Sequence, residues 1–411
     1  MKNTRSKEAL FNICARKIPV QKTFSPLAFP LQKCYDSEKK KLERGIKDME
    51  IKPNPNAVKM IQELSDAKAP SGFEDEAVAV ARKYSADFAD ASEDCLRNLY
   101  LHAKSNTGDK PVFMLDAHSD EVGLMVHSIK PNGTLRFVSL GSWSDNSLPA
   151  SKVLVRNRHG EFIPGVIAAK PPHFMTPEER QHAGSTSIQS LVIDIGAVSK
   201  EDAVENFGIR IGEPVISDVH FSYDEAHDVM IGKGFDCRIG CAALLETMRR
   251  LSAEDLNVDL VGVLSTQEEL GERGVKAAVG KVAPQIALCF EGCPADDTFT
   301  EPYAIQTALR KGPMLRFMDK SIVCSPRYQR YVLDLAEEKG LAVQSSVREG
   351  GGNNGAIINT ALDGIPVIVV GVPVRYIHSH YGITSYYDFE ATVQLATEVV
   401  RSMTADIIRS F

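Results

Sequence analysis

Residues 112–121, with the sequence VFMLDAHSDE, place a short apolar run directly before a group of titratable side chains. Residues 112–115 have the composition of a buried strand, and His118 and Asp120 follow at once. In an open α/β sheet, ligands bind beyond the carboxyl ends of the strands, because the loops there converge on a rigid base. The stretch therefore predicts a strand whose carboxyl end carries a functional site.

Three further strand patterns end in the same way. They occupy residues 258–264, 285–290 and 365–370, and helical patterns lie between them, as at 237–251 and 326–340. Glutamates follow the first two strand patterns and a histidine follows the third. Strands that alternate with helices predict an α/β fold, with a mostly parallel sheet that is flanked by helices on both faces.

Residues 128–228 depart from this rhythm. Short segments of alternating apolar and polar residues, such as 152–155 and 191–195, are separated there by glycine and proline. That pattern is typical of a β-rich module. We therefore expect a β-rich domain at 128–228, inserted into an α/β domain made of residues 49–127 and 229–411.

Two local patterns predict helix starts. Ser71 and Glu74 form a Ser-x-x-Glu pattern, which indicates a capping box for a helix that runs through Val78 and Ala81. Asp236 follows a glycine-containing segment at the start of the 237–251 pattern, where a carboxylate also suits the positive end of the helix dipole.

The charge is distributed unevenly. The whole chain of 411 residues has a net charge of −7, which argues against a nucleic-acid partner or an anionic membrane surface. Residues 1–48, however, carry twelve Lys or Arg and five Asp or Glu. We interpret them as a basic and flexible N-terminal extension. Because only one acid, Glu8, occurs in the first 35 residues, the extension also resembles an organellar transit peptide, and that alternative stays open.

No apolar run approaches the roughly 20 residues that a membrane-spanning helix needs. Eight cysteines are scattered along the chain, and their closest pairs have Cys-x3-Cys spacing rather than the spacing of zinc knuckles or redox motifs. Reduced thiols that pack as small apolar residues in a cytoplasmic protein are the simplest interpretation.

Seven titratable side chains fall at the predicted strand ends and helix start. Taken singly, each has an ordinary explanation: a histidine in a loop, a solvated pair of acids, or a helix cap. Taken together, unpaired carboxylates at the ends of buried strands carry a desolvation cost unless a cation neutralises them. Two imidazoles with carboxylates suit zinc or cobalt rather than calcium, and the set is large enough for two ions. The residues are His118, Asp120, Asp236, Glu268, Glu269, Glu291 and His378.

The chain from about residue 57 onwards resembles the tetrahedral (TET) aminopeptidases, dinuclear-metal peptidases that include glutamyl and deblocking aminopeptidases and endoglucanase-M-like proteins. The segments that carry the resemblance are 117–123, 236–240, 267–271, 375–379 and Glu291, with 165–173 and 193–197 in the insert. The resemblance implies a catalytic α/β domain with an inserted β-barrel-like domain used in dimer contacts. It also implies a homo-oligomer, commonly a hollow dodecamer that is assembled from dimers.

The same resemblance implies roles for the seven residues. His118 and Glu291 would bind one divalent ion with Asp236 as a bridge, and Glu269 and His378 would complete the pair of sites. Which ion each of the terminal ligands holds stays open at this point. Asp120 would orient the His118 imidazole. Glu268 would be the general base, acting on water whose pKa two ions lower while they polarise the scissile carbonyl. Zinc is the expected metal, with cobalt or manganese as alternatives.

Two positions depart from the family pattern. The family usually has Asp where this chain has Glu291, which is one methylene longer but chemically equivalent. The family's Gly-Thr-Asp-Ala loop reads Gly352-Asn353-Asn354-Gly355-Ala356 here, so the preference for a substrate side chain is open. We expect Gly352, Asn353, Asn354 and Arg375 to contact the substrate.

The leading hypothesis is a metalloaminopeptidase that removes N-terminal residues from short peptides. One alternative is a deacylase or another amidohydrolase, which uses the same chemistry on a different amide. The other is a catalytically silent, metal-stabilised assembly protein. A glycosidase gains no support, because these carboxylates are committed to metal.

Overall fold

The computed structural model describes residues 51–181 and 187–411. The basic extension predicted at residues 1–48 lies outside the described residues. Among those that are described, no helix is both long enough and apolar enough to span a bilayer.

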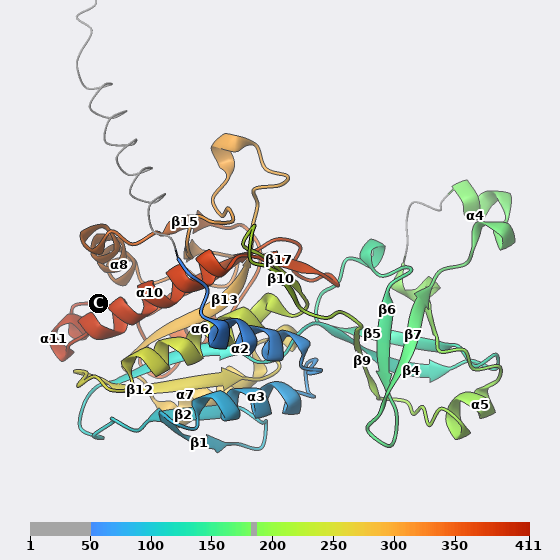
Figure 1. Cartoon of the computed structure of the whole chain (residues 1–411), viewed down its shortest axis with the longest axis horizontal. Coiled ribbons are helices and arrows are strands. Elements are labelled where there is room, and N and C mark those ends of the chain that lie inside the picture. The colour runs from blue at the N-terminus through green and yellow to red at the C-terminus, as the bar shows by residue number, and fades with distance from the viewer. Residues whose placement is uncertain (1–50, 182–186) are drawn as a thin grey trace, which may run out of the picture. The chain divides into compact units, whose positions relative to one another are not determined.

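The central feature is an eight-stranded sheet with the order β1-β2-β12-β3-β13-β16-β14-β15 (Figure 1). Strands β12, β3, β13 and β16 pair in parallel, as do β14 and β15, whereas β1, β2 and the β14–β16 pair are antiparallel. The predicted α/β class with a mostly parallel sheet is confirmed. The strand bounds are β1 Ala89–Glu93, β2 Leu99–Ala103, β3 Val112–His118, β12 Asp259–Ser265, β13 Ile286–Pro294, β14 Met314–Met318, β15 Gln344–Val347 and β16 Val367–Val374.

Helices cover both faces of this sheet. The strands bury side chains alternately on the two sides, so that Phe113 and Leu115 belong to one apolar core and Met114 to the other. The first core is closed by α2 (Pro55–Asp66), α3 (Asp75–Ser85), α6 (Phe235–Leu251), α8 (Pro326–Lys339) and α10 (Tyr386–Ser402), of which α2, α6 and α10 lie side by side in Figure 1. The second is closed by α7 (Arg273–Val282) and α9 (Asn354–Thr360), and α11 (Ala405–Arg409) ends the chain.

The parallel register gathers the carboxyl ends of the strands at one edge. His118 is opposite Ser265, and Glu291 is opposite Gly371. Strand β13 extends four residues beyond the predicted end at 290, so Glu291 lies within the strand and not after it. Buried neighbours on both sides of the strand hold its carboxylate at a defined place.

The insert is a closed barrel with the order β4-β5-β8-β7-β6-β9. Its own core includes Leu124, Val153 and Ile193 and is separate from the two cores of the sheet. The strands are β4 Gly123–Ile129, β5 Leu135–Leu140, β6 Lys152–Arg156, β7 Phe162–Ala168, β8 Val192–Asp194 and β9 Pro214–Ser217; α4 (Pro177–Gln181) and α5 (Lys200–Glu205) lie in its connections. The predicted inserted barrel is confirmed, while the domain limits of 128 and 228 stay a prediction.

The chain returns from the barrel through a small three-stranded sheet. Strands β10 (Ser222–Asp224), β11 (Val229–Gly232) and β17 (Gly382–Thr384) pair antiparallel. Two residues of the insert also contact His380, which lies in the loop between β16 and β17. The Ser217 Oγ lies 2.7 Å from the His380 Nδ1, and the ring centroids of Trp143 and His380 are 5.0 Å apart. The barrel therefore contacts the loop that carries His378.

Candidate metal centre

Three loops at this edge carry the polar groups. Asp236 stands at the start of α6, after Gly234 with φ +59°. Glu268 and Glu269 begin the short 3₁₀ helix Glu268–Leu270 that follows β12. His378, with φ +55°, lies in the loop between β16 and β17. Because non-glycine residues seldom adopt positive φ, the last loop depends on its tertiary contacts for its shape.

Asp236 lies between the two histidines. Its Oδ1 is 3.2 Å from the Nε2 of His118, and its Oδ2 is 3.3 Å from the Nε2 of His378. The Glu291 Oε2 lies 3.9 Å from the Nε2 of His118, and the Glu269 Oε1 lies 3.4 Å from the Nε2 of His378. One carboxylate thus presents an oxygen to each of two donor sets, His118 with Glu291 and His378 with Glu269.

The chemistry of the donors fits two divalent cations. The ligand-type atoms of His118, Asp236 and Glu291 lie within 4.8 Å of one another, and so do those of Asp236, Glu269 and His378. The buried Oε1 of Glu269 has no hydrogen-bond partner. Nitrogen and carboxylate donors in this number suit zinc or a similar borderline ion. The structure therefore brings together all five predicted metal ligands.

A cavity of about 370 Å³ opens beside these groups. Glu268 lines it together with four of the predicted ligands, and Gly352 lines its far side. Other charged residues in its wall are Arg316, Arg348 and Glu349. A substrate in this cavity would lie against the predicted base and the predicted ligands together.

The carboxylates of the site crowd negative charge into a buried place. Burial is the main cause that raises the pKa of Glu291 to about 8, and the Asp236 carboxylate adds to it. Burial likewise raises the pKa of Glu268 well above its usual range, and raises that of Glu269. For His378 burial acts to lower the pKa, but contacts with Asp236 and Glu269 outweigh it and raise the pKa to about 11. Bound cations would relieve this crowding of negative charge.

We predict that removal of metal makes stability depend on pH. A group with a raised pKa in the folded state stabilises the fold below its ordinary pKa and loses that contribution as the pH rises through the folded value. For Glu291 that interval runs from 4.5 to about 8, and for His378 from 6.5 to about 11. The melting temperature of chelator-treated protein should therefore fall between about pH 6 and about pH 8. Zinc-loaded protein should lose less stability over this interval, because bound ligands are already deprotonated. Identical pH profiles for the two forms would contradict the prediction.

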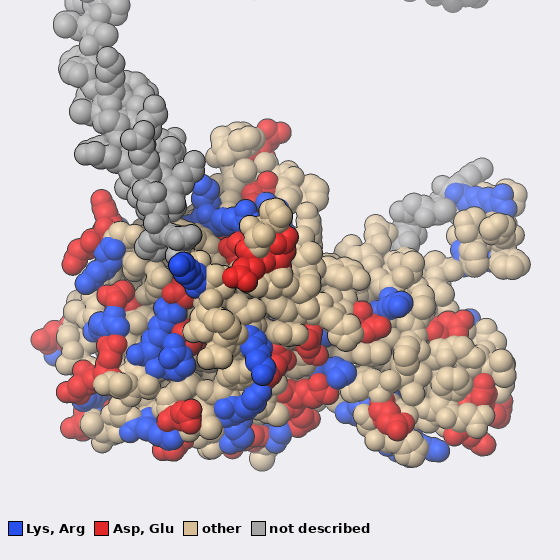
Figure 2. Space-filling view, in the orientation of Figure 1, with Lys and Arg blue, Asp and Glu red and all other residues tan. Residues whose placement is uncertain are grey.

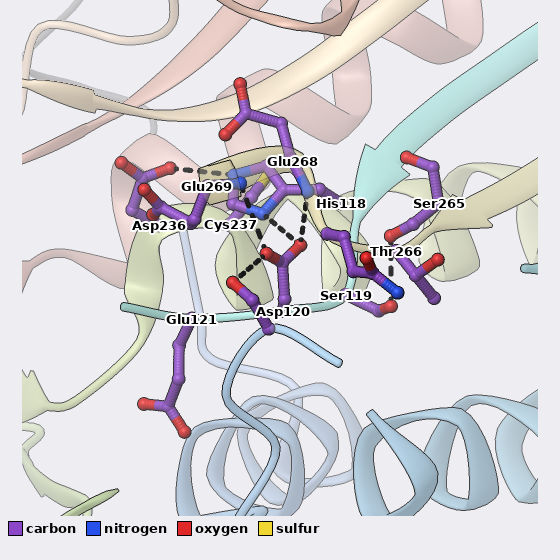
Figure 3. Close-up of polar contacts among 12 residues, drawn as sticks. His118, Ser119, Asp120, Glu121, Asp236, Cys237, Ser265, Thr266, Glu268 and Glu269 are labelled. Carbon is purple, nitrogen blue, oxygen red and sulfur yellow. Dashed lines mark hydrogen bonds and ion pairs between the residues drawn. The ribbon is translucent and has the colours of Figure 1, made fainter. Parts of the chain in front are cut away.

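Asp120 joins the histidine to the glutamate loop (Figure 3). Its Oδ1 lies 3.3 Å from the His118 Nδ1 and accepts a hydrogen bond of 3.0 Å from the backbone N–H of Glu268. Its Oδ2 accepts from the backbone N–H of Glu269 at 3.2 Å and from the Ser71 hydroxyl at 2.6 Å. Asp120 thus faces the imidazole of His118 and holds the backbone of the residue predicted as the base, while its role in orienting a metal ligand stays a prediction.

The predicted capping box at Ser71 and Glu74 is wrong. Helix α3 begins at Asp75, and neither side chain caps it. The Ser71 hydroxyl donates to Asp120, and the buried Glu74 Oε1 accepts from the backbone N–H groups of Gly72 and Gln267. Burial, with the Asp120 charge as the next cause, raises the pKa of Glu74 to about 7. Both side chains support the catalytic edge, and their local spacing alone does not reveal this.

Asp120→Asn should lower zinc affinity or turnover by about 10–100-fold, the usual cost of losing a group that orients a metal ligand. The amide removes the negative charge that faces His118 and one of the acceptors for the glutamate loop. Zinc titration and kcat/KM measure the two effects. Ser71→Ala is the control, because it removes one hydrogen bond to Asp120 and leaves the carboxylate in place. An Asp120→Asn variant no weaker than Ser71→Ala would argue against this role.

The four predicted substrate contacts are placed differently from one another. Gly352 lines the cavity, but the other three side chains are engaged elsewhere. Asn353 caps α9 and donates to Asp319, whereas Asn354 donates to Asp116 and Ser265 at 2.8 and 2.7 Å. Arg375 forms a two-pronged ion pair with Asp297. These three residues are not among those that line the cavity, and each binds a nearby carboxylate or hydroxyl; contact with a substrate stays a prediction.

The sequence of this chain is similar to those of known proteins with one kind of activity. The model of the M42 glutamyl aminopeptidase family matches residues 98–395. The chain belongs to this family. As an M42 family member it is a metallo-aminopeptidase, a hydrolase of peptide bonds, and the predicted resemblance to TET aminopeptidases is confirmed.

Individual M42 and TET proteins are similar to this chain over most of their length. The glutamyl aminopeptidase of Lactococcus lactis subsp. cremoris is 30% identical over 357 residues, which cover 84% of this chain and 96% of that protein. The TET aminopeptidase from the marine sediment archaeon Thaumarchaeota archaeon SCGC AB-539-E09 has a TM-score of 0.83 at 32% identity, covering 86% of this chain and 98% of that one. PhTET1-12s, solved as a dodecamer, has a TM-score of 0.74 at 28% identity, covering 84% and 99%.

Sequence reasoning missed several residues that complete the site. Ser71 and Glu74 hold the loop of the predicted base, and Asp116 accepts from Asn354 beneath His118. Arg316 reaches the cavity wall from β14. A polar residue at a buried strand position is a signal that could have identified Asp116 and Arg316, since such groups need partners.

Proposed function

We propose that this M42 family member is a dinuclear aminopeptidase that removes N-terminal residues from short peptides. The observation that carries the proposal is the placement of Asp236 between His118 and His378, with one oxygen 3.2 or 3.3 Å from each imidazole. Glu291 and Glu269 complete the two donor sets. A single buried carboxylate that serves two such sets supports a pair of ions rather than one.

Zinc is the metal that we expect, with cobalt and manganese as alternatives. Two divalent ions in this site would lower the pKa of a water molecule and polarise the carbonyl of the scissile bond. The protein's own part is to present five ligands from five segments of the chain and to hold them with buried contacts. Asp120 orients His118, and the Arg375–Asp297 ion pair anchors the loop that carries His378.

Glu268 is the proposed general base. It lines the cavity, and its carboxylate lies within 4.8 Å of ligand-type atoms of His118 and Glu269. Its carboxylate would accept a proton from the attacking water and donate it to the leaving amine. The hydrogen bond from its backbone N–H to Asp120 holds the residue at the cavity wall.

A panel of peptides tests the proposed function. Zinc-loaded protein should hydrolyse short peptides with a free α-amine and should release residues from that end, as seen by mass spectrometry. The same peptides with an acetylated N-terminus are the matched controls. Release of the acyl group, with no attack on free N-termini, would favour a deacylase. No hydrolysis of either set with zinc, cobalt or manganese would favour the silent assembly protein.

We propose that the barrel domain is a dimer-forming module and that dimers assemble further, up to a dodecamer. Support comes from the dodecameric PhTET1-12s and from apolar side chains exposed on the barrel domain. Light scattering and native mass spectrometry would measure the assembly, and a monomer at micromolar concentration would contradict it. The exposed apolar residues are Val138, Val166, Phe174, Val198 and Ile211.

We also propose a cytoplasmic location. All six cysteines of the described part of the chain are free thiols, and five of them are buried. Such thiols persist in a reducing compartment. Fractionation of cells that express the full chain, including residues 1–48, would distinguish the cytoplasm from an organelle.

A further inference from the structure

One thiol lies inside the candidate metal centre. Cys237 directly follows Asp236 at the start of α6 and is fully buried. Its Sγ lies within 4.8 Å of ligand-type atoms of His118, Asp236 and Glu291, which also lie within that distance of one another. Figure 3 draws the residue beside Asp236 and His118. The sulfur therefore belongs to the same cluster as the donor set that contains Glu291.

The packing around the sulfur keeps it at this place. The Sγ donates a hydrogen bond of 3.3 Å to the backbone carbonyl of Phe290, the residue before Glu291. A Cβ atom on Gly240 would lie 2.3 Å from the sulfur, so the absence of a side chain there leaves room for it. Any side chain at position 240 would displace the thiol or the helix.

The other buried thiols near the sheet edge are not in this position. The Cys241 Sγ donates to the backbone carbonyl of His118. The Cys289 Sγ lies 3.7 Å from the Asp116 Oδ2 and 4.0 Å from the Glu291 Oε1, but Cys289 does not belong to the cluster of ligand-type atoms around His118. Cys324 belongs to the apolar core under α7 and α9. Within residues 51–181 and 187–411, Cys237 is the cysteine that joins a cluster of ligand-type atoms.

We propose that Cys237 is a further ligand of the ion held by His118, Asp236 and Glu291. The inference rests on the proposed dinuclear function and adds a difference between its two sites. The site of Asp236, Glu269 and His378 has nitrogen and oxygen donors, whereas the first site also has a soft sulfur donor. Thiolates select ions such as zinc and cadmium over manganese or magnesium. The first site should therefore be the thiophilic one, and the second should exchange more readily with harder ions.

Coordination changes one bond at the sulfur. The thiol releases its proton to solvent, as cysteine ligands do, and the hydrogen bond to the Phe290 carbonyl is exchanged for a bond to the ion. The Asp236 carboxylate would still present one oxygen to each donor set.

X-ray absorption at the zinc edge tests the inference on the wild-type protein loaded with zinc. A sulfur neighbour at about 2.3 Å, in addition to nitrogen and oxygen neighbours at about 2.0–2.2 Å, is the expected result. The signal is an average over the two zinc ions, so its sulfur amplitude should correspond to one ion with a sulfur neighbour and one ion without. This measurement depends neither on turnover nor on the folding of a variant.

Cobalt substitution provides a second readout. Cobalt-loaded wild type should show a thiolate-to-cobalt charge-transfer band in the near ultraviolet, Cys237→Ser should lose it, and the matched control Cys324→Ser should keep it. Two bound zinc ions with no sulfur neighbour would overturn this inference and leave the aminopeptidase proposal intact. A protein that binds none of zinc, cobalt and manganese would overturn both.

Discussion

Glu268→Gln is expected to lower kcat by about 10²–10⁴-fold, the usual contribution of a positioned general base. Glutamine keeps the size of the side chain and its place in the cavity wall, but it cannot accept a proton from water. The metal ligands are untouched, so zinc content measured by atomic absorption should stay at two ions per chain. KM for a short peptide should change little, because the loss falls on the chemical step.

Glu272→Gln is the matched control for this variant. Glu272 lies four residues further on in the same loop, at the cap of α7, and belongs to none of the clusters of ligand-type atoms found among the described residues. Its substitution should leave kcat near that of the wild type. If Glu268→Gln retains wild-type turnover with full metal content, another group acts as the base and the proposed mechanism is wrong.

Asp236→Asn should have the second large effect, because one residue serves both donor sets. The amide has one oxygen and no charge, so it cannot present a carboxylate oxygen to His118 and to His378 together. We expect fewer than two zinc ions per chain and a loss of kcat/KM greater than the roughly 10–100-fold effect of a group that only orients a ligand.

Thermal unfolding gives an independent check on Asp236→Asn. Zinc should raise the melting temperature of the wild type, since a ligand that binds only the folded state stabilises it by mass action. That rise should be much smaller in the variant. Asp255→Asn, at an exposed position, is the control and should respond to zinc like the wild type. Two tightly bound ions in Asp236→Asn would exclude a bridging role for this residue.

Much of the fold could be predicted because its signals are local. The run at residues 112–115 reads as a buried strand in any context, since it is short and apolar, and β3 indeed begins at Val112. The helix that ends at Lys339, before Gly340 with φ +66°, follows from a proline near its start and a glycine after its end. Parallel strands present their carboxyl ends at one edge of a sheet, and this rule predicts that His118 and Glu291 lie close together.

Local signals misled where a side chain serves a distant partner. Ser71 and Glu74 have the spacing of a capping box, yet both side chains bind the catalytic edge. Asn354 occupies a loop position that suggested substrate contact, yet its amide satisfies the buried Asp116. In each case the competing partner is more than 45 residues away in the chain, so spacing within a motif contains no information about it.

The sequence by itself determined the α/β class, a β-rich insert and the candidate ligands, because periodicity, turn residues and titratable side chains at strand ends are patterns of neighbouring positions. The barrel form of the insert was implied by the family resemblance. Only the tertiary structure decided how those ligands divide. It placed Asp236 between two histidines, made Asp120 the link from His118 to the glutamate loop and put the Cys237 sulfur beside Glu291. These relations join segments more than 50 residues apart, and they exist only after the sheet and its helices have packed.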